Sequence, residues 1–202
     1  MDETMLNESV LMSIAPRFCQ LIASGKKTVE VRKSMPKRLQ TPFKCYIYCT
    51  YGDGLIEYKD EVLPNHLIEY KVSSNKIWGN CCNGRVIGEF ICDKIEVIKK
   101  NEVFNASALY SQTCLTPEEY FEYVGNKTSY FWHISNLVMY DKPKELREFE
   151  VLCGAFNDNH LSDKCYKCDY YETIAGLTGC LCCGCKPVAK APQSWCYVRE
   201  GE

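Results

Sequence analysis

Apolar and polar residues alternate along this chain in short runs, a pattern typical of a protein built mainly from β-strands. Runs of this kind predict strands over residues 9–14, 28–32, 43–50, 85–92, 94–98, 130–141 and 191–198. Two segments have helical spacing instead. The first spans residues 16–24 and ends before Gly25, and the second begins with a capping box of Thr116 and Glu119 and continues to residue 124.

The order of these elements predicts an α+β, mostly β architecture: a small mixed barrel with a few short helices. We expect this domain over residues 8–150, with a closing strand at residues 190–199. Residues 51–83 show no clear period of hydrophobic residues, which indicates a mixed polar excursion from the barrel domain. A small Cys-rich element, residues 153–189, is expected as an insertion before the closing strand.

The composition is that of a folded protein. Of 202 residues, 46% are hydrophobic and 25% are charged, which excludes the disordered and fibrous classes and allows one or two domains. The first residues are acidic, unlike the start of a signal peptide, and no stretch approaches the roughly 18 apolar residues of a membrane span. We therefore expect a cytoplasmic protein without a membrane partner.

Basic residues cluster early in a chain that is slightly acidic as a whole. The formal net charge is −2, yet residues 15–44 hold eight lysine and arginine residues against the single acid Glu30. A local excess of positive charge attracts phosphate-bearing ligands. The alternative interpretation is a solvated surface without a ligand.

The densest functional pattern lies where the first helix ends and the second strand begins. Gly25 and Lys26 stand in the turn before Lys27, and Glu30 and Arg32 share one face of the strand because they are two residues apart. One interpretation is a structural ion pair between Glu30 and Arg32. The other is a pocket in which Lys27 and Arg32 meet an anionic or amide-bearing ligand, while Glu30 accepts from ligand N–H groups or shifts protons.

The spacing Gly25-x-Lys27-x-x-Glu30-x-Arg32 resembles the G-x-K-x-x-E-x-R motif of the ASCH domain family. Three further segments are similar to the bacterial and prophage-type members of that family: Leu11-Met12-Ser13-Ile14-x-Pro16, Gly88-Glu89-Phe90 and Pro192-Gln193-Ser194-Trp195. The resemblance implies a PUA-like β-barrel with a cleft that binds RNA or a modified nucleoside. It implies ligand-binding roles for Gly25, Lys26, Lys27, Glu30 and Arg32.

The resemblance also indicates what chemistry to expect in that cleft. An unpaired base needs a flat stacking partner, and Trp132 is the preferred candidate among Tyr46, Tyr48, Trp78, Tyr130, Trp132 and Trp195. The alternative interpretation, favoured for most of these rings, is core packing. Some relatives are amidohydrolases that act on N4-acetylcytidine through the lysine and a threonine three residues later. Glu30 occupies that position here, so the threonine is missing. An enzyme in this cleft would use Lys27 and Glu30 as its proton-transfer pair.

Cysteine is the unusual residue type, at 15 of 202 residues. Without an export signal, metal ligation is favoured over disulfides. The cysteines before residue 153 are scattered among apolar neighbours and are expected as small buried side chains. Nearer the C-terminus, Cys165-x-x-Cys168 and Cys180-x-x-Cys183 are two pairs separated by eleven residues, a spacing typical of a tetrahedral zinc site.

Alternatives remain open for this metal site. Cys182 and Cys185 form an overlapping Cys-x-x-Cys pair, and His160 is a substitute ligand. Four thiolates also hold an iron–sulfur cluster, and buried or redox-active thiols without a metal are a further interpretation. A closed four-thiolate zinc site would be structural, because it leaves no position for water.

Three functional hypotheses follow. The leading one is a module that binds RNA or a modified nucleoside and carries a structural zinc. The second is a hydrolase, amidohydrolase or ribonuclease-like, that acts on RNA or a modified nucleoside in the same cleft. The third is a transcription co-regulator that works through protein contacts and leaves the cleft dispensable.

Overall fold

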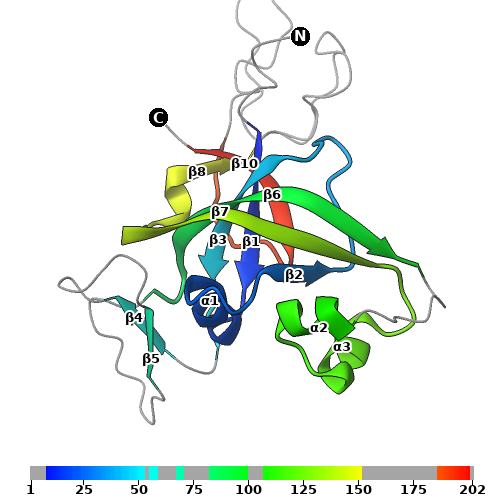
Figure 1. The fold of residues 1–202 in the computed structure, drawn as a ribbon. Helices are drawn as coiled ribbons and strands as arrows, with labels where there is room; N and C mark the ends of the chain where they lie inside the picture. The colour runs from blue at the N-terminus through cyan, green and yellow to red at the C-terminus, as the bar shows by residue number, and fades with distance from the viewer. Residues whose placement is uncertain are drawn as a thin grey trace, which may run out of the picture.

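The computed structural model describes residues 8–52, 55–58, 67–70, 82–99, 107–151 and 186–200. Within these ranges the protein is mostly β, with one sheet of eight strands, a separate pair of strands and a few short helices (Figure 1). None of the helices in these ranges has the length and apolar character that a membrane crossing requires. The predicted fold class, mostly β with short helices, is confirmed.

The main sheet has the strand order β2-β7-β6-β3-β1-β10-β8-β9. Its strands in chain order are β1 (Ser9–Ile14), β2 (Val29–Arg32), β3 (Phe43–Cys49), β6 (Arg85–Ile98), β7 (Ser129–Lys144), β8 (Phe149–Val151), β9 (Lys186–Pro187) and β10 (Trp195–Glu200). β4 (Leu55–Tyr58) and β5 (Leu67–Tyr70) pair with each other. β1 and β3 are parallel and the remaining pairs are antiparallel, so the sheet is mixed as predicted.

The parallel pair explains where the motif comes to lie. Parallel neighbours need a crossover connection, and the chain between β1 and β3 supplies it with α1 (Pro16–Ala23), the turn at Gly25 and β2. Gly25 has φ +71°, a left-handed conformation that favours glycine and ends the helix as predicted. The residues of the motif therefore lie on a connection that leaves the centre of the sheet and returns to it.

Two long strands shape the sheet. β6 pairs with β3 and with β7, and its register with β7 shifts at three places. In Figure 1, β6 and β7 run across the view, whereas β1 and β3 run down it. The sheet therefore turns strongly between them. Among the described strands β2 and β9 are its two edges, and the closed barrel stays a prediction.

Helices cover the sheet near β2. α2 (Ser107–Thr113) and α3 (Pro117–Val124) follow each other, and a single 3₁₀ turn (Leu146–Glu148) precedes β8. The predicted capping box is present, because the Thr116 side chain accepts from the Glu119 amide and the Glu119 carboxylate accepts from the Thr116 amide. The buried cluster between β2 and these helices includes Val29, Val31 and Phe131.

Most of the described cysteines before residue 153 are buried, as predicted, whereas Cys114 is half-buried. Cys19, Cys45, Cys49, Cys82 and Cys92 are all buried with free thiols. Burial raises the pKa of the Cys19 and Cys45 thiols well above the ordinary value, so both are protonated at neutral pH. These thiols contribute as small apolar side chains.

Several predicted elements differ from the structure. Residues 85–92 and 94–98 form one bent strand, β6, rather than two. Residues 28–32 were expected to form a half-buried strand with a polar face, yet every residue of β2 is buried, because the polar face lines an interior site. The helix α2 and the strands β4, β5, β8 and β9 were not predicted. Of the Cys-rich element, residues 153–185 lie outside the described residues.

Gly88 marks a close approach of β6 to β7, and we expect Gly88→Ala to destabilise the fold. A Cβ at Gly88 would lie 2.5 Å from the Val138 carbonyl oxygen and 3.2 Å from the Met139 Cα, which are backbone atoms that cannot move aside. Overpacking of this kind costs about 1–3 kcal/mol in urea denaturation. The control is Gly52→Ala, whose Cβ would lie 3.6 Å from the Pro16 side chain, an ordinary contact. Equal unfolding midpoints for the two variants would contradict this packing.

Candidate ligand-binding site

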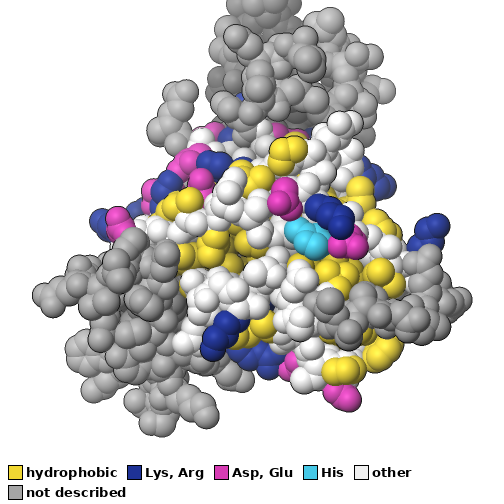
Figure 2. Space-filling view, viewed as in Figure 1, with side chains coloured by type: hydrophobic (Ala, Val, Ile, Leu, Met, Phe, Trp, Pro, Cys, Tyr) yellow, Lys and Arg dark blue, Asp and Glu magenta, His cyan; other side chains and the backbone are white. Residues whose placement is uncertain are grey.

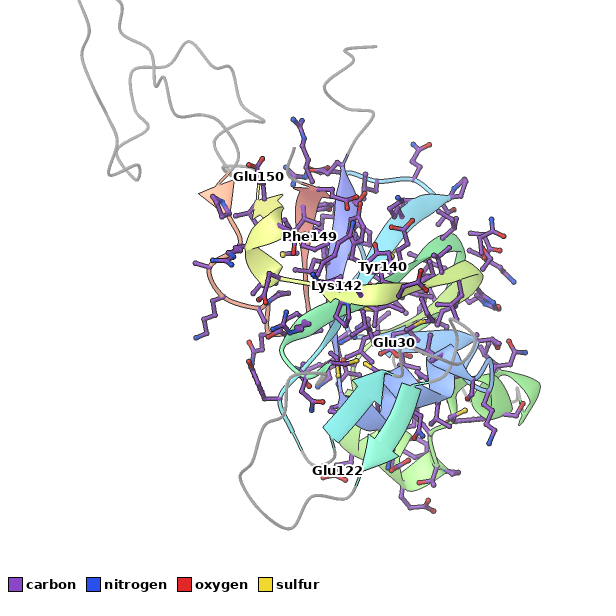
Figure 3. The ribbon with its side chains drawn as sticks, turned by 90° about the vertical axis from the view of Figure 1, so that its left-hand side faces the viewer. Glu30, Glu122, Tyr140, Lys142, Phe149 and Glu150 are labelled. Atoms are coloured by element: carbon purple, nitrogen blue, oxygen red, sulfur yellow. The ribbon has the colours of Figure 1, made fainter. Side chains whose placement is uncertain are left out.

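A cavity of about 580 Å³ lies beside β2, enclosed by residues of β1, α1, β2, α3 and the segment before β10. Its wall includes Phe18, Lys27, Glu30, Arg32, Glu122 and Tyr123. This volume falls within the range of roughly 300–1,000 Å³ that small-molecule sites occupy. Figure 3 shows Glu30 among the strands of the sheet and Glu122 on α3.

The two-residue period of β2 brings the charged residues into this wall. Glu30 and Arg32 project from one face of the strand, and Val29 and Val31 alternate with them and pack against α2 and α3. Across the antiparallel pair, Glu30 lies opposite Trp132 and Arg32 lies opposite Tyr130. The register of β2 on β7 thus fixes where the carboxylate and the guanidinium stand.

Three charged side chains form a buried network in the wall. Lys27, Glu30 and Arg32 are 2%, 7% and 6% exposed. Lys27 Nζ lies 3.2 Å from Glu30 Oε2, and Arg32 Nε lies 3.3 Å from Glu30 Oε1. Two cations share one carboxylate, so the network has a net charge of +1. A buried excess charge is costly unless it is compensated.

Lys27 is held by the protein itself. Its ammonium donates to the Val29 carbonyl at 2.9 Å and to the Thr113 carbonyl, the last of α2, at 2.6 Å. It makes these two hydrogen bonds and lies beside Glu30 as an ion-pair partner. Lys27 therefore joins α2 to β2 and positions the Glu30 carboxylate.

Arg32 ties β2 to two other parts of the chain. Its Nη2 donates to the Ser13 carbonyl of β1 at 2.7 Å, and its Nη1 lies 3.5 Å from the Ser194 hydroxyl, just before β10. Ser13 in turn donates through its hydroxyl to the Pro192 carbonyl at 2.6 Å. These hydrogen bonds join β2, β1 and the segment before β10, which are far apart in the sequence, at the wall of the cavity.

The network leaves two polar atoms in need of hydrogen bonds. Glu30 Oε2 and Arg32 Nε are buried, and neither has a hydrogen-bond partner among the described residues. Both make the close ion contacts given above, but those contacts are misaligned for hydrogen bonding. The wall therefore presents one acceptor and one donor, on groups that touch each other.

Aromatic rings stand beside these charges. The Arg17 guanidinium and the Lys27 ammonium lie 4.4 Å and 4.9 Å from the centre of the Phe18 ring. The Lys33 ammonium lies 4.4 Å from the centre of the Tyr123 ring. Burial raises the pKa of Tyr123, and the Arg32 guanidinium nearby opposes that rise. Phe18 and Tyr123 give the cavity two flat apolar surfaces.

The outer part of the cavity is bridged by an ion pair. Arg17 of α1 donates to Glu119 of α3 at 2.7 Å, and both side chains are substantially exposed. Glu119 also caps α3 through the Thr116 amide, and these contacts hold the pKa of Glu119 below its usual value. α1 and α3 are thereby joined across the cavity.

The structure brings together three of the residues predicted for this site and leaves three apart from it. Lys27, Glu30 and Arg32 line the cavity, whereas Gly25 and Lys26 lie in the adjoining turn and are exposed. The remaining residue, Trp132, is placed differently from the prediction.

Trp132 lies in the core rather than in the cavity wall. Its side chain is 0% exposed and packs edge-on against Phe43, with ring centres 5.5 Å apart, and beside Trp195, at 5.9 Å. The prediction of a stacking surface at Trp132 is corrected, because the ring is fully buried and does not line the cavity. Phe18 and Tyr123 are the aromatic residues that do line the cavity.

The early basic cluster is divided among several places. Four of its members line the cavity, namely Arg17, Lys27, Arg32 and Lys33. Arg38 pairs with Glu8 and Lys44 pairs with Glu89. On the face shown in Figure 2, basic and acidic side chains are interspersed. The cluster in the sequence is therefore divided between the cavity and separate ion pairs.

The predicted metal ligands lie outside the described residues: Cys165, Cys168, Cys180, Cys183, the alternatives Cys182 and Cys185, and His160. In the described part of the chain, no group of three or more His, Cys, Asp or Glu side chains is arranged to hold a metal ion. The zinc site stays a prediction.

Sequence reasoning missed the walls that α1 and α3 contribute. Phe18, Glu122 and Tyr123 line the cavity, and Gln193 lines it from the segment before β10. The helical spacing of Glu119, Glu122 and Tyr123 after the capping box indicates that they share one face of α3. Spacing alone did not indicate that this face turns toward β2.

Comparisons with known proteins were made by family, by sequence and by structure. No family model matches the chain, and no curated protein matches its sequence. Among solved structures, the chain is similar to an ASCH protein from Zymomonas mobilis, with 20% identity over 68% of this chain and 73% of that one and a TM-score of 0.47. A tyrosine-to-phenylalanine variant of that protein gives 20% identity, coverage of 68% and 76%, and a TM-score of 0.45.

We expect Lys27→Met to destabilise the protein far more than Lys26→Met. Removing the Lys27 ammonium leaves the buried Val29 and Thr113 carbonyls without their donor, whereas Lys26 is exposed in the same turn. A buried acceptor that loses its donor costs about 1–3 kcal/mol. Urea denaturation of both variants measures the difference. Similar stabilities would mean that Lys27 does not hold the network.

Proposed function

We propose that this protein is a binding module that takes up one nucleobase-bearing unit, from RNA or as a modified nucleoside, in the cavity beside β2. The supporting observation is the buried pair of Glu30 Oε2 and Arg32 Nε, an acceptor and a donor without hydrogen-bond partners among the described residues. Buried polar atoms almost always have such partners. A ligand that donates to the carboxylate and accepts from the guanidinium would complete both, and base edges carry neighbouring donors and acceptors of this kind.

The rest of the cavity wall is suited to the same ligand. Phe18 and Tyr123 offer aromatic faces, on which unpaired bases stack. Arg17 and Lys33 lie over those rings and add guanidinium and ammonium groups that strengthen contacts with polar rings. The motif resemblance, with its RNA or nucleoside ligand, agrees with this chemistry.

The charge distribution favours one unit in a cavity over a long strand on a surface. Most cations of the early basic cluster have acidic partners, and the chain as a whole has a formal charge of −2. Binding of an extended polyanion relies on many uncompensated cations. The network charge of +1 inside the cavity suits a neutral ligand with polar edges or a single negative group.

The environment of Lys27 favours binding over hydrolysis. A proton-transfer group must reach the reacting atom, whereas the Lys27 side chain already donates to the Val29 and Thr113 carbonyls and lies against the Glu30 carboxylate. A hydrolase that uses Lys27 and Glu30 as a proton-transfer pair is the alternative function, and it differs from the binding module by product formation.

A structural zinc near the C-terminus forms the second part of the proposal. Its ligands are the four thiolates of Cys165, Cys168, Cys180 and Cys183, which fit a tetrahedral ion by type and spacing. Such ligands need to remain reduced, which fits the cytoplasmic setting expected from the sequence.

We expect wild-type protein to bind at least one of cytidine, uridine, adenosine and guanosine, or a short single-stranded RNA, in isothermal titration calorimetry. Glu30→Gln keeps the size of the side chain and removes the charged acceptor, so affinity should fall about tenfold or more. Lys26→Gln, in the exposed turn, is the matched control and should bind as wild type. Thermal melting of each variant separates lost binding from lost folding.

Two outcomes would contradict the binding module. The first is that wild-type protein binds none of these probes. The second is that Glu30→Gln protein is folded and binds with full affinity, which would show that the cavity is not the binding site. Chromatography of the same mixtures detects turnover. Product that depends on Lys27 and Glu30 would instead establish the hydrolase.

We expect anaerobically purified protein to contain about one zinc per chain by elemental analysis. Cys165→Ser should lower the zinc content strongly, whereas Cys114→Ser, which changes a thiol remote from the predicted ligands in the sequence, should leave it unchanged. Iron with sulfide in place of zinc would indicate a cluster. A full zinc content in Cys165→Ser protein would exclude this ligand set.

A further inference from the structure

One carboxylate of the cavity wall has no role in the network described above. Glu119 and Glu122 stand one helical turn apart on α3, and both line the cavity. Glu119 is engaged by the α3 cap and by Arg17. The Glu122 side chain is exposed and makes no hydrogen bond or ion pair with another described residue. It is therefore an available acceptor at the outer end of the cavity.

The positions of the two glutamates give the cavity an inner and an outer end. Glu30, on β2, is 7% exposed, whereas Glu122, on α3, is exposed; Figure 3 labels both. Tyr123 follows Glu122 in the chain and also lines the cavity. A nucleobase whose edge meets Glu30 and whose ring lies against Tyr123 would have its sugar at the outer end, near Glu122. Gln193 and Lys33 also line the cavity.

We propose that Glu122 accepts hydrogen bonds from the vicinal 2′- and 3′-hydroxyls of a ribose, so that the cavity selects a unit whose diol is free. This inference rests on the proposed function and adds which end of the nucleic-acid unit is recognised. A free ribonucleoside and the 3′-terminal residue of an RNA both carry such a free diol.

A carboxylate is suited to a diol and unsuited to a phosphate. Its two oxygens only accept, so they match two neighbouring hydroxyl donors, and hydrogen bonds to a charged acceptor are the stronger kind. A 3′-phosphate at the same place would face the like charge of Glu122. Arg17 is paired with Glu119, which leaves Lys33, over the Tyr123 ring, as the nearby cation that would favour a phosphate.

The test uses calorimetry with the ribonucleoside that binds wild-type protein most tightly, its 2′-deoxy form and its 3′-monophosphate. We expect the last two to bind about tenfold more weakly, because one charged hydrogen bond is lost or a repulsion is added. Each of these two ligands gives a ratio of its dissociation constant to that of the ribonucleoside. In Glu122→Gln protein, affinity for the ribonucleoside should fall and both ratios should move toward one. Glu118→Gln, a change on the same helix away from the cavity wall, should preserve the wild-type ratios.

A trinucleotide with a free 3′ end, compared with the same trinucleotide carrying a 3′-phosphate, distinguishes the two sources of the diol. Binding of the free-ended trinucleotide indicates the end of an RNA, and binding of the nucleoside alone indicates a free metabolite. Ratios near one in wild-type protein, or wild-type ratios that persist in Glu122→Gln protein, would overturn the role of Glu122 while Glu30-dependent binding remains. Absence of any ribonucleoside or RNA binding would overturn this inference together with the proposed function.

Discussion

The carboxylate of Glu30, held between Lys27 and Arg32, is the interaction on which the region around β2 depends. Through Lys27 it is tied to the end of α2, and through Arg32 to β1 and to the segment before β10. A buried charge without partners is unstable, so these side chains require one another and hold their separate segments at fixed positions. Local backbone pairing alone would not join them.

This arrangement fixes the positions of the charged groups in the cavity wall and determines which ligand chemistry they can accept. The ammonium of Lys27 donates to two backbone carbonyls, whereas Glu30 and Arg32 each keep a polar atom that the described residues do not complete. A positively charged ligand would meet a network that is already positive. A planar ligand with mixed donor and acceptor edges meets both groups without adding charge, and the rings of Phe18 and Tyr123 lie beside it.

The sequence predicted the parts of this site that are local. β1, α1 and β2 follow from short periods, and the shared face of Glu30 and Arg32 follows from their spacing. It did not predict that this face is buried, because α3 and the segment before β10 come from distant parts of the chain. Trp132 was assigned to the wrong side for the same reason: the strand pattern shows that its side chain is apolar, and only the packing of Phe43 and Trp195 shows that it is covered. β8 and β9 are too short to have a recognisable period.

The edge of the sheet at β8 and β9 has a consequence for how this protein can vary. Glu150 pairs with Pro187 and Val151 pairs with Lys186, so the chain leaves the sheet and re-enters it on adjacent strands. The two ends of the intervening segment are therefore fixed side by side by strand pairing, on the opposite edge of the sheet from β2. A change in the length of that segment leaves the strand order and the cavity beside β2 as they are, so the two parts of the chain can vary independently in evolution.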